Sequence, residues 1–225
     1  MCGRFTLFTP ASRLAEVFLP GEVLAATPRY NIAPSQPVLA VRSSATSGGR
    51  EFAMPRWGLV PAWARDAAIG NRLINARAET VSEKPAFRRA FRERRCLVPA
   101  DGFYEWKREG AVKRPFYIRM RGGAPFAFAG IWERWEGIGG ESVETCAILT
   151  TEPNDLLAPI HDRMPLILPR EEYGRWLDPS VRAPENLSHL LRPFPSGTME
   201  AYPVGRTVNN PQTDGPSCIR PADAG

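Results

Sequence analysis

The 225-residue sequence contains no uninterrupted apolar run of about 18 residues, the least that a membrane-spanning helix needs. Its opening, Met1-Cys-Gly-Arg-Phe-Thr, has neither a charged n-region nor an apolar h-region, so we expect no signal peptide. Together these absences predict a protein with no membrane partner that works in the cytoplasm.

Cysteine and histidine are also scarce. The four cysteines, at positions 2, 96, 146 and 218, lie far apart without a C-x-x-C pair, and there are only two histidines. A disulfide framework is not expected in so long a chain, and the possible ligands are too few for a typical zinc site. We therefore expect a reducing compartment and neither a metal nor another cofactor.

Lysine is the rare cation, with 3 lysines against 26 arginines, and the formal net charge is +5. This mild excess is compatible with nucleic-acid binding but does not prove it. Arginine suits bidentate phosphate recognition, although a GC-rich genome gives the same bias. With 43% hydrophobic and 10% aromatic residues the chain can bury a core, which excludes a disordered tail or a fibrous protein.

Twenty-three prolines interrupt every long pattern and predict short elements. Helices are indicated after Thr9-Pro10, with Leu14, Val17 and Phe18 on one face, and at 85–95, 171–177 and 184–191. Short runs typical of strands occupy 38–42, 52–60, 95–99, 103–106, 115–120, 126–132, 145–151 and 165–168. This irregular interleaving favours one α+β domain with a curved, mostly antiparallel, barrel-like β-sheet core and short peripheral helices.

The glycine-rich segments 43–49 and 137–140 predict surface loops, the second at the tip of a hairpin. The folded core should span about residues 2–210, followed by a loose tail at 211–225. On the helix at 85–95, Arg88, Arg89, Arg92 and Arg95 should point outward. With Arg94 they form either a patch that contacts a nucleic-acid backbone or, slightly favoured, a solvated face.

Cys2 carries the most informative chemistry. Its small side chain favours removal of Met1, which leaves an α-amine with a pKa of about 8 beside a thiol with a pKa of about 8.5. Such a 1,2-aminothiol captures an aldehyde in two steps, because the amine forms a Schiff base and the thiolate then closes a five-membered thiazolidine. Taken alone, a chance cysteine after Met1 is the commoner interpretation.

Three further motifs carry polar groups that suit such chemistry. Asn75-Ala-Arg77 places an amide that can orient a reacting group two residues from a guanidinium that can bind phosphate. Glu105 lies in an aromatic run, where a dry site raises the pKa of a carboxyl, and His161 can donate to a sugar hydroxyl near neutral pH. His189 lies among Leu187, Leu190 and Leu191, which favours a buried structural role.

Six motifs together resemble one family, the SOS-response-associated peptidases that process abasic sites in DNA. They are Met1-Cys-Gly-Arg-Phe, Arg29-Tyr-Asn-Ile-Ala-Pro34, Trp57-Gly-Leu-Val-Pro-Ala-Trp63, Ile74-Asn-Ala-Arg77, Asp101-Gly-Phe-Tyr-Glu-Trp106 and Ile160-His-Asp-Arg-Met-Pro165. The resemblance covers about residues 2–210 in family order and includes Val208-Asn-Asn-Pro.

The resemblance implies a role for each motif. Cys2 would form a thiazolidine crosslink with the C1′ aldehyde of an abasic sugar, Asn75 would position its amine or the sugar, Glu105 would shuttle protons and His161 would hydrogen-bond the opened sugar. DNA contacts would come from Arg4 and Arg77 on phosphates and from Trp63 and Pro34 on neighbouring bases. Ala64 stands where the family often has a second aromatic residue, which predicts weaker stacking by that loop.

The resemblance further implies a monomer that binds abasic sites in single strands or at strand junctions, at damaged DNA in the nucleoid, with possible self-removal of Met1 and lyase-type activity. Two other classes stay open. An N-terminal Cys-Gly also begins glutamine amidotransferases, in which the thiolate attacks an amide within a four-layer α/β fold. Alternatively, the protein is a non-catalytic single-strand-binding module in which Cys2 is incidental.

Overall fold

The computed structural model describes residues 2–19, 27–44 and 48–222. Two curved sheets, not closed into a barrel, confirm the predicted α+β class. The first has the order β14-β9-β8-β1-β2 and is antiparallel, with strands β1 (Phe5–Leu7), β2 (Arg29–Ile32), β8 (Gly102–Glu109), β9 (Val112–Met120) and β14 (Met199–Pro203).

The second sheet has the order β12-β11-β10-β7-β3-β4. Its strands are β3 (Ala40–Ser43), β4 (Arg50–Ala53), β7 (Arg95–Ala100), β10 (Phe126–Glu136), β11 (Ser142–Thr151) and β12 (Met164–Pro165). β13 (Ile167–Leu168) pairs with β10, whereas β5 (Arg56–Trp57) and β6 (Asn75–Arg77) run parallel to β11. The predicted strand at 165–168 is therefore two strands, because the chain changes partner from β11 to β10 at Leu166.

The core lies between the two sheets. Phe5 of β1 and Phe103 of β8 each pack edge-on against Phe128 of β10, with ring centroids 5.7 and 6.0 Å apart. The predicted hairpin tip at 137–140 is confirmed, since it joins β10 to β11. In the predicted loop at 43–49, residues 45–47 lie outside the described part of the chain.

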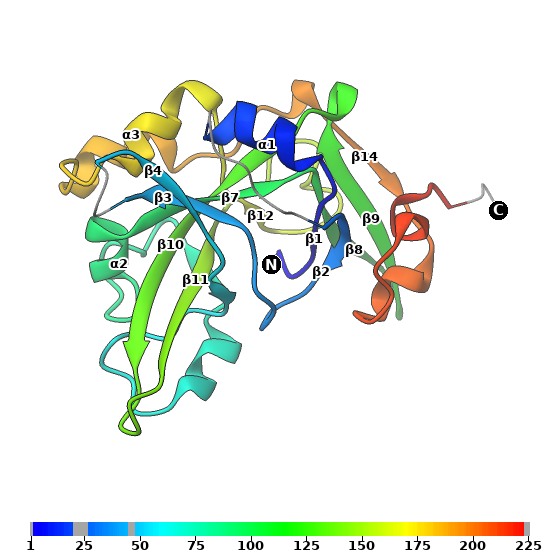
Figure 1. Cartoon of the computed structure of the whole chain (residues 1–225). Coiled ribbons are helices and arrows are strands. Elements are labelled where there is room, and N and C mark those ends of the chain that lie inside the picture. The colour runs from blue at the N-terminus through cyan, green and yellow to red at the C-terminus, as the bar shows by residue number, and fades with distance from the viewer. Residues whose placement is uncertain (1, 20–26, 45–47, 223–225) are drawn as a thin grey trace.

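The helices are short, as expected. They are α1 (Ala11–Phe18), α2 (Arg88–Glu93) and α3 (Tyr173–Leu177), with 3-10 turns at Ala67–Arg72, Arg121–Gly123, Arg170–Glu172, Pro184–Leu190, Ser196–Thr198, Arg206–Asn209 and Pro216–Ile219. α1 and α3 lie at one end of the molecule (Figure 1), where the ring of Phe18 stacks on Tyr173. No helix in these ranges is long and apolar enough to cross a membrane.

Arg95 does not lie on the outward face of the second helix, where the sequence predicted it. The helix ends at Glu93, and Arg95 begins β7 with only 5% of its surface exposed. Its guanidinium donates hydrogen bonds to five main-chain carbonyl oxygens, those of Phe91, Arg92, Trp176, Asp178 and Val181. It therefore ties α2 to the segment around α3 and cannot contact DNA.

Arg95→Lys should lower the free energy of unfolding by about 3 kcal/mol, because an ammonium has too few N–H groups for five acceptors. For a chain of this size the melting temperature should fall by about 6–12 °C, measured by circular dichroism. Arg92→Lys is the control, since the Arg92 side chain is exposed. Equal melting temperatures for the two variants would show that the buried hydrogen bonds contribute little.

The C-terminal segment differs from the predicted loose tail. Asp214 accepts hydrogen bonds from the main-chain N–H groups of Tyr30 and Asn31 in β2, and it pairs with Arg29. Cys218 is fully buried in a small cluster with Tyr104 and Tyr117. Residues 211–222 are thus anchored to the first sheet, because their few apolar and acidic side chains find partners there.

Candidate active site

Cys2 lies just before β1 and is fully buried. Its carbonyl oxygen accepts a hydrogen bond from Asn75 Nδ2 at 2.8 Å, which fixes the start of the chain against β6. Burial raises the pKa of the thiol, and the charge of Glu105 raises it further. The resting sulfur is therefore a thiol, and its activation requires a base.

Glu105 is the buried carboxyl whose charge acts on that thiol. It lies in β8 with 2% of its surface exposed, and burial raises the pKa of its carboxyl to about 7, helped by the charge of Asp162. A group with this pKa is half protonated at neutral pH, so it can both accept and donate a proton. The sequence predicted this shift from the aromatic surroundings.

His161 faces the same carboxylate, with Nε2 3.8 Å from Glu105 Oε2. The main-chain N–H of Arg163 donates to His161 Nδ1 at 3.0 Å in the neutral tautomer that carries its proton on Nε2, toward Glu105. Protonated Nδ1 would instead donate to Asp162 Oδ1, 3.0 Å away. Burial lowers the pKa of His161, so the neutral ring prevails at pH 7.

Two clefts each contain a residue that acts on Cys2. The first, of about 590 Å³, contains Asn75, whose amide contacts the Cys2 carbonyl, and it is lined by Trp63, Leu73, Asn75, Arg77, Thr80, Lys84, Pro85, Ala86, Phe87 and Thr150. The second, of about 580 Å³, contains Glu105, whose charge acts on the Cys2 thiol, and it is lined by Glu105, Trp106, Arg108, Lys113, Ile160, His161 and Asn209. The structure thus brings Cys2, Asn75, Glu105 and His161 together from four distant segments.

A family model described as SOS response associated peptidase (SRAP) matches residues 1–211. The chain belongs to this family. The abasic site processing protein YoqW of Bacillus subtilis (strain 168) is 44% identical over 223 residues, with 97% of this chain and 99% of YoqW covered. HMCES of Mus musculus, also named an abasic site processing protein, is 34% identical, with 87% of this chain and 65% of HMCES covered. A crystal structure of a protein from Bacteroides thetaiotaomicron matches with a TM-score of 0.85 and 31% identity, over 98% of this chain and 100% of that one.

Of the four residues that the SRAP resemblance implies for DNA contact, two line the first cleft and two line neither cleft. Arg77 lines the first cleft, and Trp63, 61% exposed, stands at its edge. Arg4 is half-buried and its guanidinium already donates to Asn31 Oδ1 and to the Val208 carbonyl, at 2.9 and 2.8 Å. Pro34 lies in the turn after β2 and lines neither cleft.

The arginine cluster of this SRAP chain is divided by the fold. Arg88, Arg89 and Arg92 are exposed on α2, which fits the solvated face, whereas Arg94 pairs with the buried Glu133. Arg89 alone borders a hollow next to Trp63. None of the five arginines lines either cleft beside Cys2.

Sequence reasoning missed the pair of Arg163 and Glu79. The guanidinium binds the carboxylate through two hydrogen bonds of 2.7 and 2.9 Å and also donates to the Thr150 carbonyl at 2.7 Å. This pair joins the loop that carries His161 to the turn after Asn75-Ala-Arg77. Its only sequence signal is the position of Arg163 inside the SRAP motif that begins at Ile160.

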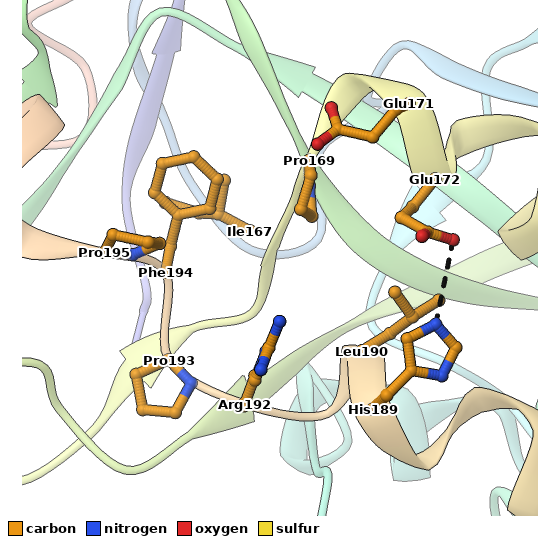
Figure 2. A pocket seen from close by; sticks show the side chains of 10 residues that line it. All are labelled: Ile167, Pro169, Glu171, Glu172, His189, Leu190, Arg192, Pro193, Phe194 and Pro195. Atoms are coloured by element: carbon orange, nitrogen blue, oxygen red, sulfur yellow. Dashed lines mark ion pairs between the residues drawn. The ribbon is translucent and has the colours of Figure 1, made fainter.

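Figure 2 shows a further cavity, of about 510 Å³, whose lining includes none of the residues that flank Cys2. His189 lies at its rim with Nε2 3.8 Å from Glu172 Oε2, and 46% of its side chain is exposed. The predicted buried structural role of His189 is therefore wrong, because the 3-10 turn Pro184–Leu190 buries Leu187 and Leu190 instead.

Proposed function

We propose that this protein processes abasic sites in DNA by forming a covalent thiazolidine with the opened sugar through Cys2, after removal of Met1. One observation carries the proposal: the buried Cys2 has its carbonyl held by the Asn75 amide, and its thiol feels the charge of a buried carboxyl, Glu105, with a pKa of about 7. Membership of the SRAP family, and relatives named abasic site processing proteins, support it. The fold of two curved sheets disfavours the alternative of a four-layer amidotransferase.

The chemistry balances with one water lost. The Cys2 amine adds to the C1′ aldehyde, and the resulting carbinolamine releases water to form an imine. The Cys2 sulfur then bonds to the imine carbon and its proton passes to the imine nitrogen, which closes the ring. Glu105 moves protons in sugar opening and ring closure, while the Nε2–H of His161 donates to the hydroxyl that sugar opening releases.

Recognition of a sugar without a base must rely on phosphates, shape and the aldehyde itself. Arg77 is suited to bind a flanking phosphate and Trp63 to stack on a neighbouring base. Arg4 and Pro34 have a structural role in this proposal. Arg4 holds β2 and the C-terminal segment in place. We expect a cytoplasmic monomer that acts on single strands and strand junctions once Met1 has been removed.

Intact-mass spectrometry, before and after addition of an oligonucleotide with one abasic site, tests the proposal. We expect a chain without Met1 and an adduct one water lighter than the sum of protein and DNA. Loss of Met1 without an adduct, together with hydrolysis of free glutamine, would support the amidotransferase instead. A chain that keeps Met1, forms no adduct and still binds single strands would be a non-catalytic module.

A further inference from the structure

The two clefts beside Cys2 have matching chemistry. The first presents one tryptophan and two cations, Trp63 with Arg77 and Lys84. The second presents Trp106 with Arg108 and Lys113, in a nearly equal volume of about 580 Å³. The proposed strand contacts account for the first cleft only, which leaves the second set of groups without a function.

Arg108 and Lys113 lie opposite each other on the hairpin formed by β8 and β9. Both are exposed, and within the ranges that the structure describes neither forms an ion pair with a carboxylate. Their neighbour Lys107, by contrast, lies 3.7 Å from Glu109 and outside the cleft lining. The rim of the second cleft therefore carries two uncompensated positive charges, which attract a polyanion.

Trp106 provides a fixed aromatic surface in the same cleft. Its indole Nε1 donates to Asn209 Oδ1 at 2.8 Å, so the ring is tied to the anchored C-terminal segment. It is half-buried and borders the space beside Glu105 and His161. A held ring with an accessible side is suited to stacking against an unpaired base.

We propose that the DNA strand passes through both clefts, with Arg108 and Lys113 binding phosphates on the side of the lesion opposite Arg77. This inference rests on the proposed function, and it adds that the protein binds the strand on both sides of the lesion. A strand continues in both directions from an abasic residue, and each cleft contains a residue that acts on Cys2, Asn75 in the first and Glu105 in the second. Each cleft offers two cations for phosphates and one indole for a base.

The test uses two oligonucleotides of about eight nucleotides that carry tetrahydrofuran, an abasic analogue without an aldehyde, at the 5′ or the 3′ end. Binding is measured by fluorescence anisotropy over a salt series. The double variant Arg108→Ala/Lys113→Ala should weaken binding of one oligonucleotide and Arg77→Ala that of the other. For the oligonucleotide that it affects, the double variant should show a plot of log affinity against log salt that is shallower by about 1.4 than that of the wild type. Between about 50 and 200 mM salt, the variant should therefore lose about 7-fold less affinity than the wild type loses.

Lys107→Ala/Arg114→Ala is the matched control, because it removes the same charge from adjacent cross-strand positions that do not line the cleft. The inference fails if the Arg108/Lys113 variant equals this control, or weakens both oligonucleotides equally, or weakens the same one as Arg77→Ala. Failure of the wild-type protein to bind either oligonucleotide would also overturn the inference, whereas the proposed function fails only if an oligonucleotide with a true abasic site yields no covalent adduct.

Discussion

Cys2→Ser should abolish the permanent DNA adduct while leaving reversible strand binding unchanged. Serine keeps the α-amine, so an imine still forms, but its hydroxyl is a far weaker nucleophile than a thiolate and closes no stable ring. Denaturing gels of protein mixed with an abasic oligonucleotide should show no shifted band for the variant. The same mixture treated with borohydride, which reduces imines, should recover the band.

Cys218→Ser is the matched control, because Cys218 is equally buried but lies in the cluster with Tyr104 and Tyr117. It should form the adduct to the wild-type extent. A heat-stable adduct of Cys2→Ser without reductant would show that sulfur takes no part in the linkage. Loss of adduct in both variants would indicate that cysteine replacement harms the fold.

Glu105→Gln should stabilise the fold at high pH and slow adduct formation. The pKa of Glu105 rises from 4.5 to about 7 in the folded protein, so the folded state holds a proton that the unfolded state has released between these values. Stability is therefore full below about pH 4.5 and is lost as pH rises through about 7, by about 3 kcal/mol in all. Glutamine cannot ionise, so urea unfolding at pH 8 should show the variant to be more stable by about that amount.

The rate of adduct formation should change in the opposite direction. Loss of a proton shuttle typically costs about 100-fold or more, and the pH–rate profile should lose its inflection near pH 7. Glu109→Gln, on the same strand but exposed, should change neither property. A wild-type rate for Glu105→Gln, even with the added stability, would remove Glu105 from the mechanism.

Local patterns in the sequence were sufficient for elements whose contacts are local. The helix after Thr9-Pro10 follows from the spacing of Leu14 and Phe18, and the hairpin around 137–140 from its glycines. The raised pKa of Glu105 was also accessible, because a carboxylate within an aromatic run is a property of adjacent residues.

Features set by distant contacts could not be predicted. The local sequence around Arg95 is that of a solvated arginine. The carbonyl oxygens that accept its hydrogen bonds in the segment around α3 lie 81 to 86 positions farther along the chain. The C-terminal segment has the composition of a linker, and only the hydrogen bonds of Asp214 to β2 show that it is anchored. The structural role of Arg163 depends on Glu79, which lies 84 residues earlier in the chain. None of these partners leaves a periodic signal near the residue it binds.

The parallel pairing of β6 with β11 has a consequence for folding kinetics. Asn75 lies beside Ile148, and His161 lies farther along the chain, so the site closes only after contacts of high sequence separation have formed. Such contacts form late, because the entropy of closing large loops must be overcome first. On the proposed function, a nascent chain would therefore carry Cys2 at its start long before the site around it has formed, and in a refolding chase the yield of DNA adduct should follow the slowest phase.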